Sequence, residues 1–441
     1  GVEAYLNGEW EQARALLEVG HYSEYEVMTK EALKSIEAEI ERWYPLLLRI
    51  FTYYSCVGAD IANTVSGIPA PGYTMLIDHA RLDSASPDAT GRVSRFARPR
   101  GGEGWDLIWV SINSSNLSTK QAAWNSQLRL TRSEFIEFIV RSSVTEQDQP
   151  EDAVARVRAF CEDLISFIDA HPDAESILHN PDEFRRQHCY RRETDAMLKH
   201  HDETLRSLFK VYAEKGAGGI EVDGATDLMS VPQWMALMKD VGIVKECGVR
   251  NLYLIFAQSR MACIKESNTV RSQLTQLPFE GFLEAMVRLS LLKALPTDRE
   301  LKKRAFQYPG EYIGAILNRG VAMLDAWTIA NKKAQLSGRA DPIFWRVDML
   351  ILVIVSVMQY GVEVQPGGPT LLLRGHPDEI LCLEEVQRYW KRPTRTVFEE
   401  VAQEAAKEAP SSPGRGSAAG SPQGSAWGAR STAMAALKLA T

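Results

Sequence analysis

The chain has 441 residues, with 50 Lys and Arg against 57 Asp and Glu, which gives a formal net charge of −7. Hydrophobic residues make up 45% and charged residues 24%, the composition of an ordinary globular protein and not of a disordered, fibrous or membrane chain. The mild acidity disfavours a general nucleic-acid binder, because such a protein carries a basic face. At about 150 residues per domain, the length indicates roughly three globular units.

The six cysteines are too few for a secreted disulfide scaffold, and none belongs to a CxxC motif. We therefore expect reduced, buried thiols in a cytosolic protein. The chain begins at Gly1 without a methionine, so we expect a fragment or a processed product. No apolar run reaches the ~18 residues of a membrane span. The most apolar run, residues 349–358, is about half that length, and we expect it to form a buried core helix or strand.

The first twenty residues carry apolar side chains at helical spacing, at Tyr5, Leu6, Trp10, Ala13, Leu16 and Leu17. This segment resembles a tetratricopeptide-type hairpin, and it also resembles the helical segment that follows the catalytic domain of many class III nucleotide cyclases. We predict a helical N-terminal segment over residues 1–44. From Ser411 onward Gly, Ser, Ala and Pro dominate, and we predict a disordered tail over residues 408–441.

The most informative feature is an internal repeat. Residues 130–143 (LTRSEFIEFIVRSS) match residues 277–290 (LPFEGFLEAMVRLS), with identities at Leu130/Leu277, Phe135/Phe282, Glu137/Glu284, Val140/Val287, Arg141/Arg288 and Ser143/Ser290. Upstream, residues 50–58 match residues 208–216 through Phe51/Phe209, Tyr54/Tyr212 and Gly58/Gly216. Each copy also holds an apolar run between these landmarks, at residues 105–112 and 249–256. We therefore predict that each copy folds as two helix–loop–helix units in succession.

The order of these landmarks resembles that of an EF-hand protein. A helix ending in Phe-x-x-Tyr, a loop, a short apolar extension and a helix opening with Glu-Phe form this pattern. The second copy continues with Met229, then Ser230 as a helix N-cap and Pro232 in the first turn. The chain thus resembles the degenerate, calmodulin-like EF-hand pairs of protist ciliary proteins and, more loosely, the tubulin-polymerisation-promoting family, over residues 45–295.

This resemblance implies a mainly α fold with a first EF-hand-like lobe at residues 45–148 and a second at residues 204–295. The helical spacing of apolar residues predicts connecting helices in residues 149–203. One covers residues 154–168, with Cys161 on its apolar face, and another runs over residues 181–209. Residues 296–400 predict a C-terminal helical unit with helical period over residues 312–333. Its Pro-Gly-Gly-Pro turn predicts a β-hairpin that joins residues 362–364 to residues 370–374.

The calcium chemistry of an EF-hand requires oxygen ligands at positions 1, 3 and 5 of the loop and a bidentate Glu at position 12. With Leu130 at position 8, position 12 is Glu134, but positions 1, 3 and 5 carry no carboxylate. With Leu277 at position 8, position 12 is Gly281, which has no ligating side chain. We therefore predict that calcium chelation has been lost. The alternative is a calcium sensor with non-standard ligands, drawn from Glu134 and from three acids whose spacing does not fit a loop: Glu221, Asp223 and Asp227.

Four arginines, Arg92, Arg95, Arg98 and Arg100, surround Phe96 and form a candidate partner-binding patch. Guanidinium groups bind acidic partners, for example a tubulin tail or a phosphate group. The alternative, which we favour, is a solvated, mobile loop inserted in the first lobe. Five of the eight histidines lie between residues 171 and 201 without the i,i+4 spacing of a helical zinc site, so we expect partly exposed helix histidines.

The chain has no nucleophile elbow, metalloprotease motif or dinucleotide-binding motif, so we predict a non-enzymatic protein without a cofactor. The leading hypothesis is a cytoplasmic protein-binding scaffold of the cilium or the cytoskeleton, whose lobes hold a partner helix in apolar grooves. Its partner would be a microtubule or a ciliary complex, not a nucleic acid. The alternatives are a calcium-binding sensor and the C-terminal regulatory region of a larger signalling protein such as a nucleotide cyclase.

Overall fold

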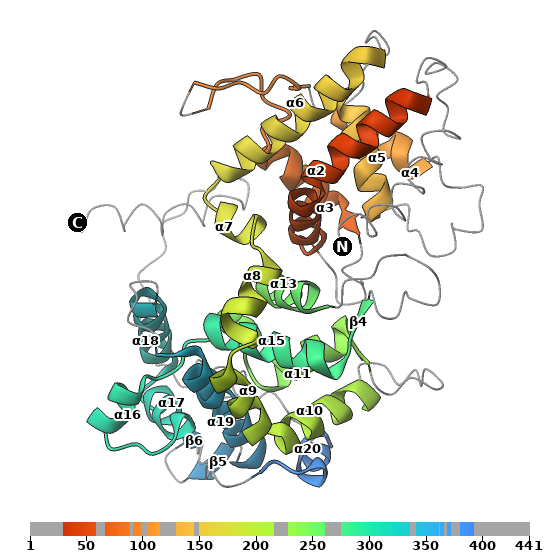
Figure 1. The fold of residues 1–441 in the computed structure, drawn as a ribbon. Helices are drawn as coiled ribbons and strands as arrows, with labels where there is room; N and C mark the ends of the chain where they lie inside the picture. Colours follow the sequence, from red (N-terminus) through yellow and green to blue (C-terminus); the bar gives the residue numbers. More distant parts are fainter. Residues whose placement is uncertain are drawn as a thin grey trace, which may run out of the picture. The chain divides into compact units, whose positions relative to one another are not determined.

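The computed structural model of the chain describes residues 30–58, 67–88, 91–98, 104–114, 129–144, 150–215, 228–260, 275–335, 341–360, 362–365, 368–371 and 380–391 (Figure 1). These residues fold mainly as α-helices, which confirms the predicted fold class, and their few strands form three two-stranded antiparallel sheets. The predicted N-terminal hairpin over residues 1–20 and the predicted disordered tail over residues 408–441 lie outside the described residues. The described helices gather around two hydrophobic cores, which define a first and a second lobe.

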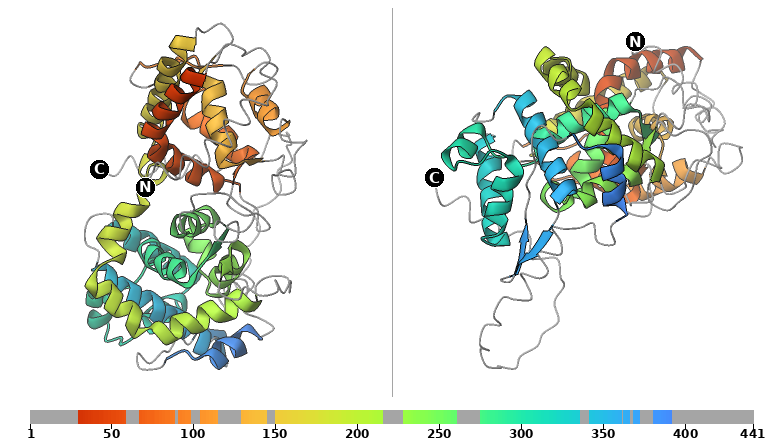
Figure 2. Two further views of the ribbon diagram at one scale, coloured as in Figure 1. Left: turned by 45° about the vertical axis from the view of Figure 1, so that its right-hand side comes forward. Right: turned by 90° about the horizontal axis from the view of Figure 1, so that it is seen from below.

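The first lobe is built on four helices and one strand pair. Its elements in chain order are α2 (Lys30–Ser55), β1 (Ile68–Pro69), α3 (Ala70–His79), α4 (Trp105–Ser114), β2 (Arg129–Leu130) and α5 (Arg132–Ser143). β1 and β2 pair antiparallel, with Ile68 opposite Leu130. The long helix α6 (Pro150–Asp169) packs against both α2 and α5, and the short helix α7 (Ala174–Ile177) follows it. Figure 2 shows α6 alongside α2.

The second lobe repeats this order of elements. The corresponding segments are α10 (Asp202–Lys215), β3 (Met229–Ser230), α11 (Val231–Asp240), α13 (Val249–Ser259), β4 (Gln276–Leu277) and α15 (Phe279–Leu292), with one short helix, α12 (Val244–Cys247), before α13. β3 and β4 also pair antiparallel, with Met229 opposite Leu277. Ser230 is the N-cap of α11 and a proline stands in its first turn, as the sequence predicts.

Matched side chains make equivalent contacts in the two lobes. The rings of Phe51 on α2 and Phe135 on α5 lie 5.7 Å apart, centroid to centroid. The rings of Phe209 on α10 and Phe282 on α15 lie 5.5 Å apart. Both pairs join the first helix of a lobe to its fourth, and they bury large aromatic side chains between the two. Because these four residues are matched in the internal repeat, the self-match of the sequence marks equivalent elements of the structure.

Other helices of the same chain fill the core of each lobe. In the first lobe, α6 contributes Val157, Phe160 and Leu164, which are fully buried on one face. In the second lobe, α19 (Ile343–Tyr360) packs against α15, and its residues 349–358 are all buried, so the predicted core segment is a helix. A helix that is apolar around its whole circumference must be enclosed. Among the described residues, no helix combines the length and the apolar character that crossing a membrane requires.

Two predicted helices are interrupted. The region over residues 181–209 is divided into α8 (Pro181–Phe184), the π-helix η3 (Arg185–Cys189), α9 (Arg192–His200) and α10. The region over residues 312–333 is divided into α17 (Pro309–Leu317) and α18 (Val321–Ala334), because Gly320 between them has a φ of +116°, outside the helical range. The predicted hairpin forms, with β5 (Val362–Gln365) paired antiparallel with β6 (Gly368–Leu371), but the strands also include Gln365, Gly368 and Pro369, which the sequence assigns to the turn.

The cores do not follow two of the expected segment boundaries. α2 runs past residue 44 without a break, and Ile36 and Ile40 already belong to the first core. The C-terminal unit, which also includes α16 (Asp298–Lys303) and α20 (Leu383–Trp390), packs into the second core through residues such as Tyr312 and Tyr389. The described residues of the C-terminal unit therefore share a hydrophobic core with the second lobe.

Candidate functional site

The fourth helix of each lobe carries a glutamate and an arginine one turn apart: Glu137 and Arg141 on α5, and Glu284 and Arg288 on α15. Residues four apart lie on the same face of a helix, so each carboxylate reaches its guanidinium group directly. The Glu137 side chain is 0% exposed and the Arg288 side chain 4%. Charged side chains are rarely buried this deeply unless they are paired, so both ion pairs belong to the core.

Each arginine also reaches the third helix of its lobe. Arg141 Nη1 donates to Ser111 Oγ on α4 at 2.7 Å, and Arg288 Nη1 donates to Gln258 Oε1 on α13 at 2.9 Å. Ser111 and Gln258 both stand 30 residues before their arginine, so the two contacts are equivalent in the repeat. We call each set of three residues a Glu–Arg clamp: Ser111, Glu137 and Arg141 form the first clamp, and Gln258, Glu284 and Arg288 form the second.

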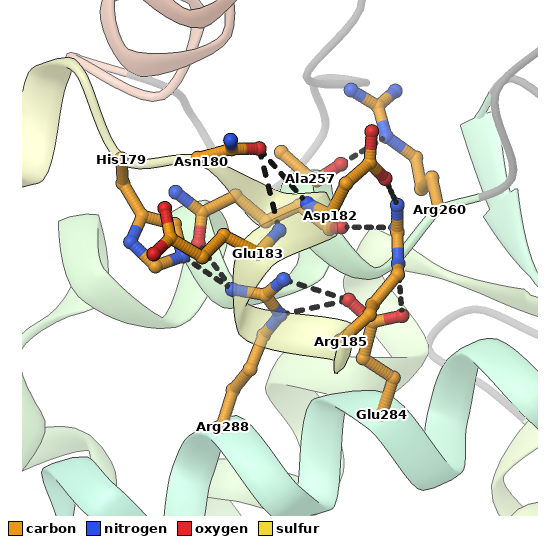
Figure 3. Close-up of polar contacts among 10 residues, drawn as sticks. His179, Asn180, Asp182, Glu183, Arg185, Ala257, Arg260, Glu284 and Arg288 are labelled. Carbon is orange, nitrogen blue, oxygen red and sulfur yellow. Dashed lines mark hydrogen bonds and ion pairs between the residues drawn. The ribbon is translucent and has the colours of Figure 1, made fainter. Parts of the chain in front are cut away.

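The second clamp receives further partners from the segment that precedes α9 (Figure 3). Arg185 Nε donates to Glu284 Oε2 at 2.8 Å, and its Nη2 donates to the Gln258 carbonyl oxygen at 2.9 Å. Arg288 Nε donates to the other carboxylate oxygen, Glu284 Oε1, at 2.9 Å. Glu284 therefore lies between two guanidinium groups. Hydrogen bonds in which both partners are charged are the strong ones, and here they join η3 to α15.

Local sequence explains how α8 and η3 reach this position. Asn180 caps α8 by accepting hydrogen bonds from two backbone N–H groups, at 3.2 and 3.4 Å. The ring centroid of Phe184 lies 4.1 Å from the Arg288 guanidinium carbon, a cation–π contact. His179 Nε2 lies 3.0 Å from Arg288 Nη1. A helix cap, an aromatic ring and an imidazole thus fix the π-helix against α15.

Burial sets the protonation states around both clamps. Burial, followed by the charge of Arg288, lowers the pKa of His179 to about 4, so this imidazole is neutral at pH 7 and can accept a hydrogen bond from Arg288. Burial raises the pKa of Glu137 to about 7 against the opposing charge of Arg141. The ion pair with Arg141 lowers this pKa, but its effect is smaller than that of burial. Burial also raises the pKa of Cys189, the last residue of η3, to about 12, so its thiol stays protonated and unreactive.

The structure describes one of the predicted calcium ligands. Glu134 is buried at the start of α5, where its Oε2 accepts hydrogen bonds from Thr131 N at 2.7 Å and from Thr131 Oγ at 2.9 Å. This is a helix capping box. The other three candidate ligands, Glu221, Asp223 and Asp227, lie outside the described residues. In the part of the chain that the structure describes, no group of three or more His, Cys, Asp or Glu is placed to hold a metal ion.

Three of the four arginines of the candidate partner-binding patch are described, Arg92, Arg95 and Arg98, whereas Arg100 lies outside the described residues. Arg92 forms an ion pair with Asp88 at 3.3 Å, and Arg95 forms one with Asp163 of α6 at 2.7 Å. Arg98 donates to the Ser142 carbonyl oxygen at the end of α5 at 3.1 Å. These arginines attach residues 91–98 to the first lobe, and the binding of an acidic partner by this patch stays a prediction.

Sequence reasoning missed two parts of this site. It identified Glu137/Glu284 and Arg141/Arg288 as matches but did not pair them, although their i,i+4 spacing on a helix is the usual signal of an ion pair. It also passed over residues 185–192 (RRQHCYRR), which hold four arginines in eight positions. Ser111 and Gln258 could not be found by residue identity, because they share only their position and a polar side chain.

Comparison of the chain with models of protein families, with curated proteins and with solved structures finds no match in any of the three.

Proposed function

We propose that the chain is a non-catalytic protein-binding scaffold made of two EF-hand-pair-like lobes, in which a Glu–Arg clamp takes the place of a bound calcium ion. One observation carries the proposal: the order helix, strand, helix, helix, strand, helix occurs twice, and the two strands pair antiparallel in each lobe. Leu130 and Leu277, which the resemblance assigns to position 8 of an ion loop, both lie in these strands. This placement supports an EF-hand-like origin of both lobes.

The clamps support the loss of calcium. In a working EF-hand, the glutamate at position 12 ligates the ion from the start of the second helix. In the first lobe the residue at this position is Glu134, whose carboxylate caps its own helix. In the second lobe it is Gly281, which has no side chain to offer. In both lobes the clamp instead joins the two helices of the second hand, α4 to α5 and α13 to α15, through a hydrogen bond between side chains.

The proposed binding of a partner takes place on the outside of the lobes. The sequence suggests apolar grooves that hold a partner helix, but helices of the same chain occupy the core of each lobe. α6 packs against α2 and α5, and α19 packs against α15. A lobe that already encloses a helix of its own has less apolar surface to offer a second one. We therefore propose that these lobes act as rigid supports for an external contact surface.

A calorimetric titration of the full chain with calcium at millimolar concentration tests the proposal against the calcium-sensor alternative. We expect no saturable heat. The matched control is Glu134→Gln, which removes the one described candidate ligand, and we expect its trace to equal that of the unmodified chain. A saturable heat in the unmodified chain that is lost in Glu134→Gln, or in a chain with Glu221, Asp223 and Asp227 neutralised, establishes the sensor and refutes the proposal.

The cellular location and the partner of the scaffold are proposed from the resemblance to the EF-hand pairs of ciliary proteins. A cytoplasmic role in the cilium or the cytoskeleton, with a microtubule or a ciliary complex as the partner, is proposed on this ground. The alternative in which the chain is the regulatory C-terminal region of a nucleotide cyclase rests on residues 1–20, which lie outside the described residues.

A further inference from the structure

A basic, aromatic surface lies at the junction of η3 and α9. Arg186, Tyr190, Arg191 and Arg192 are all exposed there, and the Tyr190 side chain is 74% exposed. Tyr190 occupies the turn between the two helices, and Arg191 is the N-cap of α9, where it provides no side-chain acceptor for the first N–H groups. We call these four residues the Arg186–Arg192 surface. The chain as a whole has a net charge of −7, so this surface differs in sign from the chain that carries it.

The acidic residues around this surface do not neutralise it. Each of three has a partner on its own helical segment: Asp182 pairs with Arg185 at 2.8 Å, Asp195 pairs with Lys199 at 2.7 Å, and Glu183 accepts from Gln187 Nε2 at 2.9 Å. By contrast, Arg186 and Arg192 have neither an ion pair nor a side-chain hydrogen bond with any described residue. Arg191 Nε donates to a backbone carbonyl, that of Gln187, at 3.0 Å. Three positive charges therefore face solvent, and the two acids beside them that form no ion pair with a described residue are Glu183 and Glu193.

The second clamp holds this surface in place. Arg185, the residue before Arg186, is fixed by Glu284 and by the Gln258 carbonyl oxygen. A π-helix is a rare conformation that is found most often at functional sites, because its extra residue changes the direction of the side chains that follow. In this π-helix, Arg185 forms an ion pair with Glu284, whereas its neighbour Arg186 is exposed to solvent. A surface that is held rigidly before binding loses less conformational entropy when a partner arrives.

We propose that the Arg186–Arg192 surface binds an acidic segment of a partner protein. This inference rests on the proposed scaffold function and names the chemistry of its partner. The planar guanidinium fork fits a carboxylate with two parallel hydrogen bonds, and tyrosine and arginine are the residues that dominate binding energy at protein interfaces. The surface covers one helix junction and is bordered by Glu183 and Glu193. An extended polyanion such as a nucleic acid requires a longer basic face without acids, and therefore fits less well.

The test is the binding of a fluorescent deca-glutamate peptide to the full chain, followed by anisotropy at physiological salt. Reversing the charge of Arg186, Arg191 and Arg192 to Glu is expected to weaken binding by about 100-fold, since each exposed charge pair contributes several-fold. The matched control reverses three other exposed cations to Glu, Lys303, Arg319 and Lys333, and is expected to change binding by less than about threefold. Tyr190→Ala, which changes no charge, is expected to weaken binding by about tenfold.

Two results overturn the inference. One is equal binding by the two charge-reversed variants, which makes the attraction general and not local. The other is tighter binding of a single-stranded RNA oligonucleotide, or of phosphatidylserine vesicles, than of the peptide. Circular dichroism of each variant confirms that it is folded, and Tyr190→Ala provides a second test that does not depend on charge reversal. Neither result changes the calcium titration, in which no saturable heat is expected. A failure of this inference can therefore be told apart from a failure of the scaffold proposal.

Discussion

The two lobes carry the same pair of charged residues at equivalent positions, but each lobe surrounds its pair differently. In the second lobe, Glu284 lies between the guanidinium groups of Arg185 and Arg288. In the first lobe, the described guanidinium paired with Glu137 is that of Arg141. Burying a carboxylate is unfavourable, and one cation without further hydrogen bonds offsets less of that cost than two. The pKa of Glu137 accordingly rises to about 7.

This difference separates two uses of one motif. The second clamp fastens a π-helix to the lobe and so supports the exposed Arg186–Arg192 surface. The first clamp ties α4 to α5 and has a carboxylate that changes charge near neutral pH. The charge of the buried pair in the first lobe therefore depends on pH near neutrality.

Glu284→Gln should destabilise the second lobe by about 3–5 kcal/mol, because it leaves the buried Arg288 without its carboxylate and removes one of the two carboxylates that pair with Arg185. The equivalent change in the first lobe, Glu137→Gln, should instead stabilise that lobe at pH 7, by up to about 3 kcal/mol, because glutamine resembles the protonated form and removes a buried group whose folded-state pKa is raised to about 7. Hydrogen exchange measured separately for α15 and α5 in the full chain gives both values. Equal losses in the two lobes would mean that the clamps are energetically alike.

The pH dependence of the first lobe should change sharply in Glu137→Gln. Because the folded-state pKa of Glu137 is raised from 4.5 to about 7, its contribution to stability is fully present below pH 4.5 and is lost as the pH rises through 7. The stability of the unmodified first lobe relative to the variant should therefore fall by about 3 kcal/mol between pH 4 and pH 8. Other titrating groups are common to both chains and cancel. Parallel pH profiles of α5 protection in the two chains would refute a raised pKa.

Arg185→Gln should destabilise the second lobe by about 2 kcal/mol, because it removes a charge-assisted hydrogen bond to Glu284 and leaves the Gln258 carbonyl oxygen without this donor. The neighbouring Arg186→Gln is the matched control and should change stability by less than about 0.5 kcal/mol, since Arg186 is exposed. Chemical unfolding followed by tryptophan fluorescence compares the two variants. A larger loss of stability for Arg186→Gln than for Arg185→Gln would show that Arg185 is not the residue that anchors η3.

Ser111→Ala and Gln258→Ala should each cost about 1 kcal/mol in their own lobe, the smallest effect, because each removes one hydrogen bond to a clamp arginine. Hydrogen exchange of α4 and α13 reports the two losses. If either substitution has no effect on its own lobe, the two clamps are not equivalent in the repeat.

The sequence predicts much of the fold because its strongest signals are local. Identical residues such as Phe135/Phe282 mark equivalent helices, a Pro-Gly-Gly-Pro turn marks the hairpin, and an unbroken apolar run marks α19. The interruptions escape prediction because they depend on single backbone conformations, such as that of Gly320. The candidate site escapes for another reason. Arg185 and Glu284 are 99 residues apart, and only the folded lobe brings them into contact.

The central claim is that protein groups, and not an ion, hold the third and fourth helices of each lobe together. Hydrogen exchange of the full chain in millimolar calcium and in a calcium chelator tests it most directly, read at β2 and α5 in the first lobe and at β4 and α15 in the second. We predict the same protection in both solutions for all four elements. Higher protection in calcium at either strand–helix pair would contradict the account, because it would show that an ion contributes what we assign to the Glu–Arg clamps.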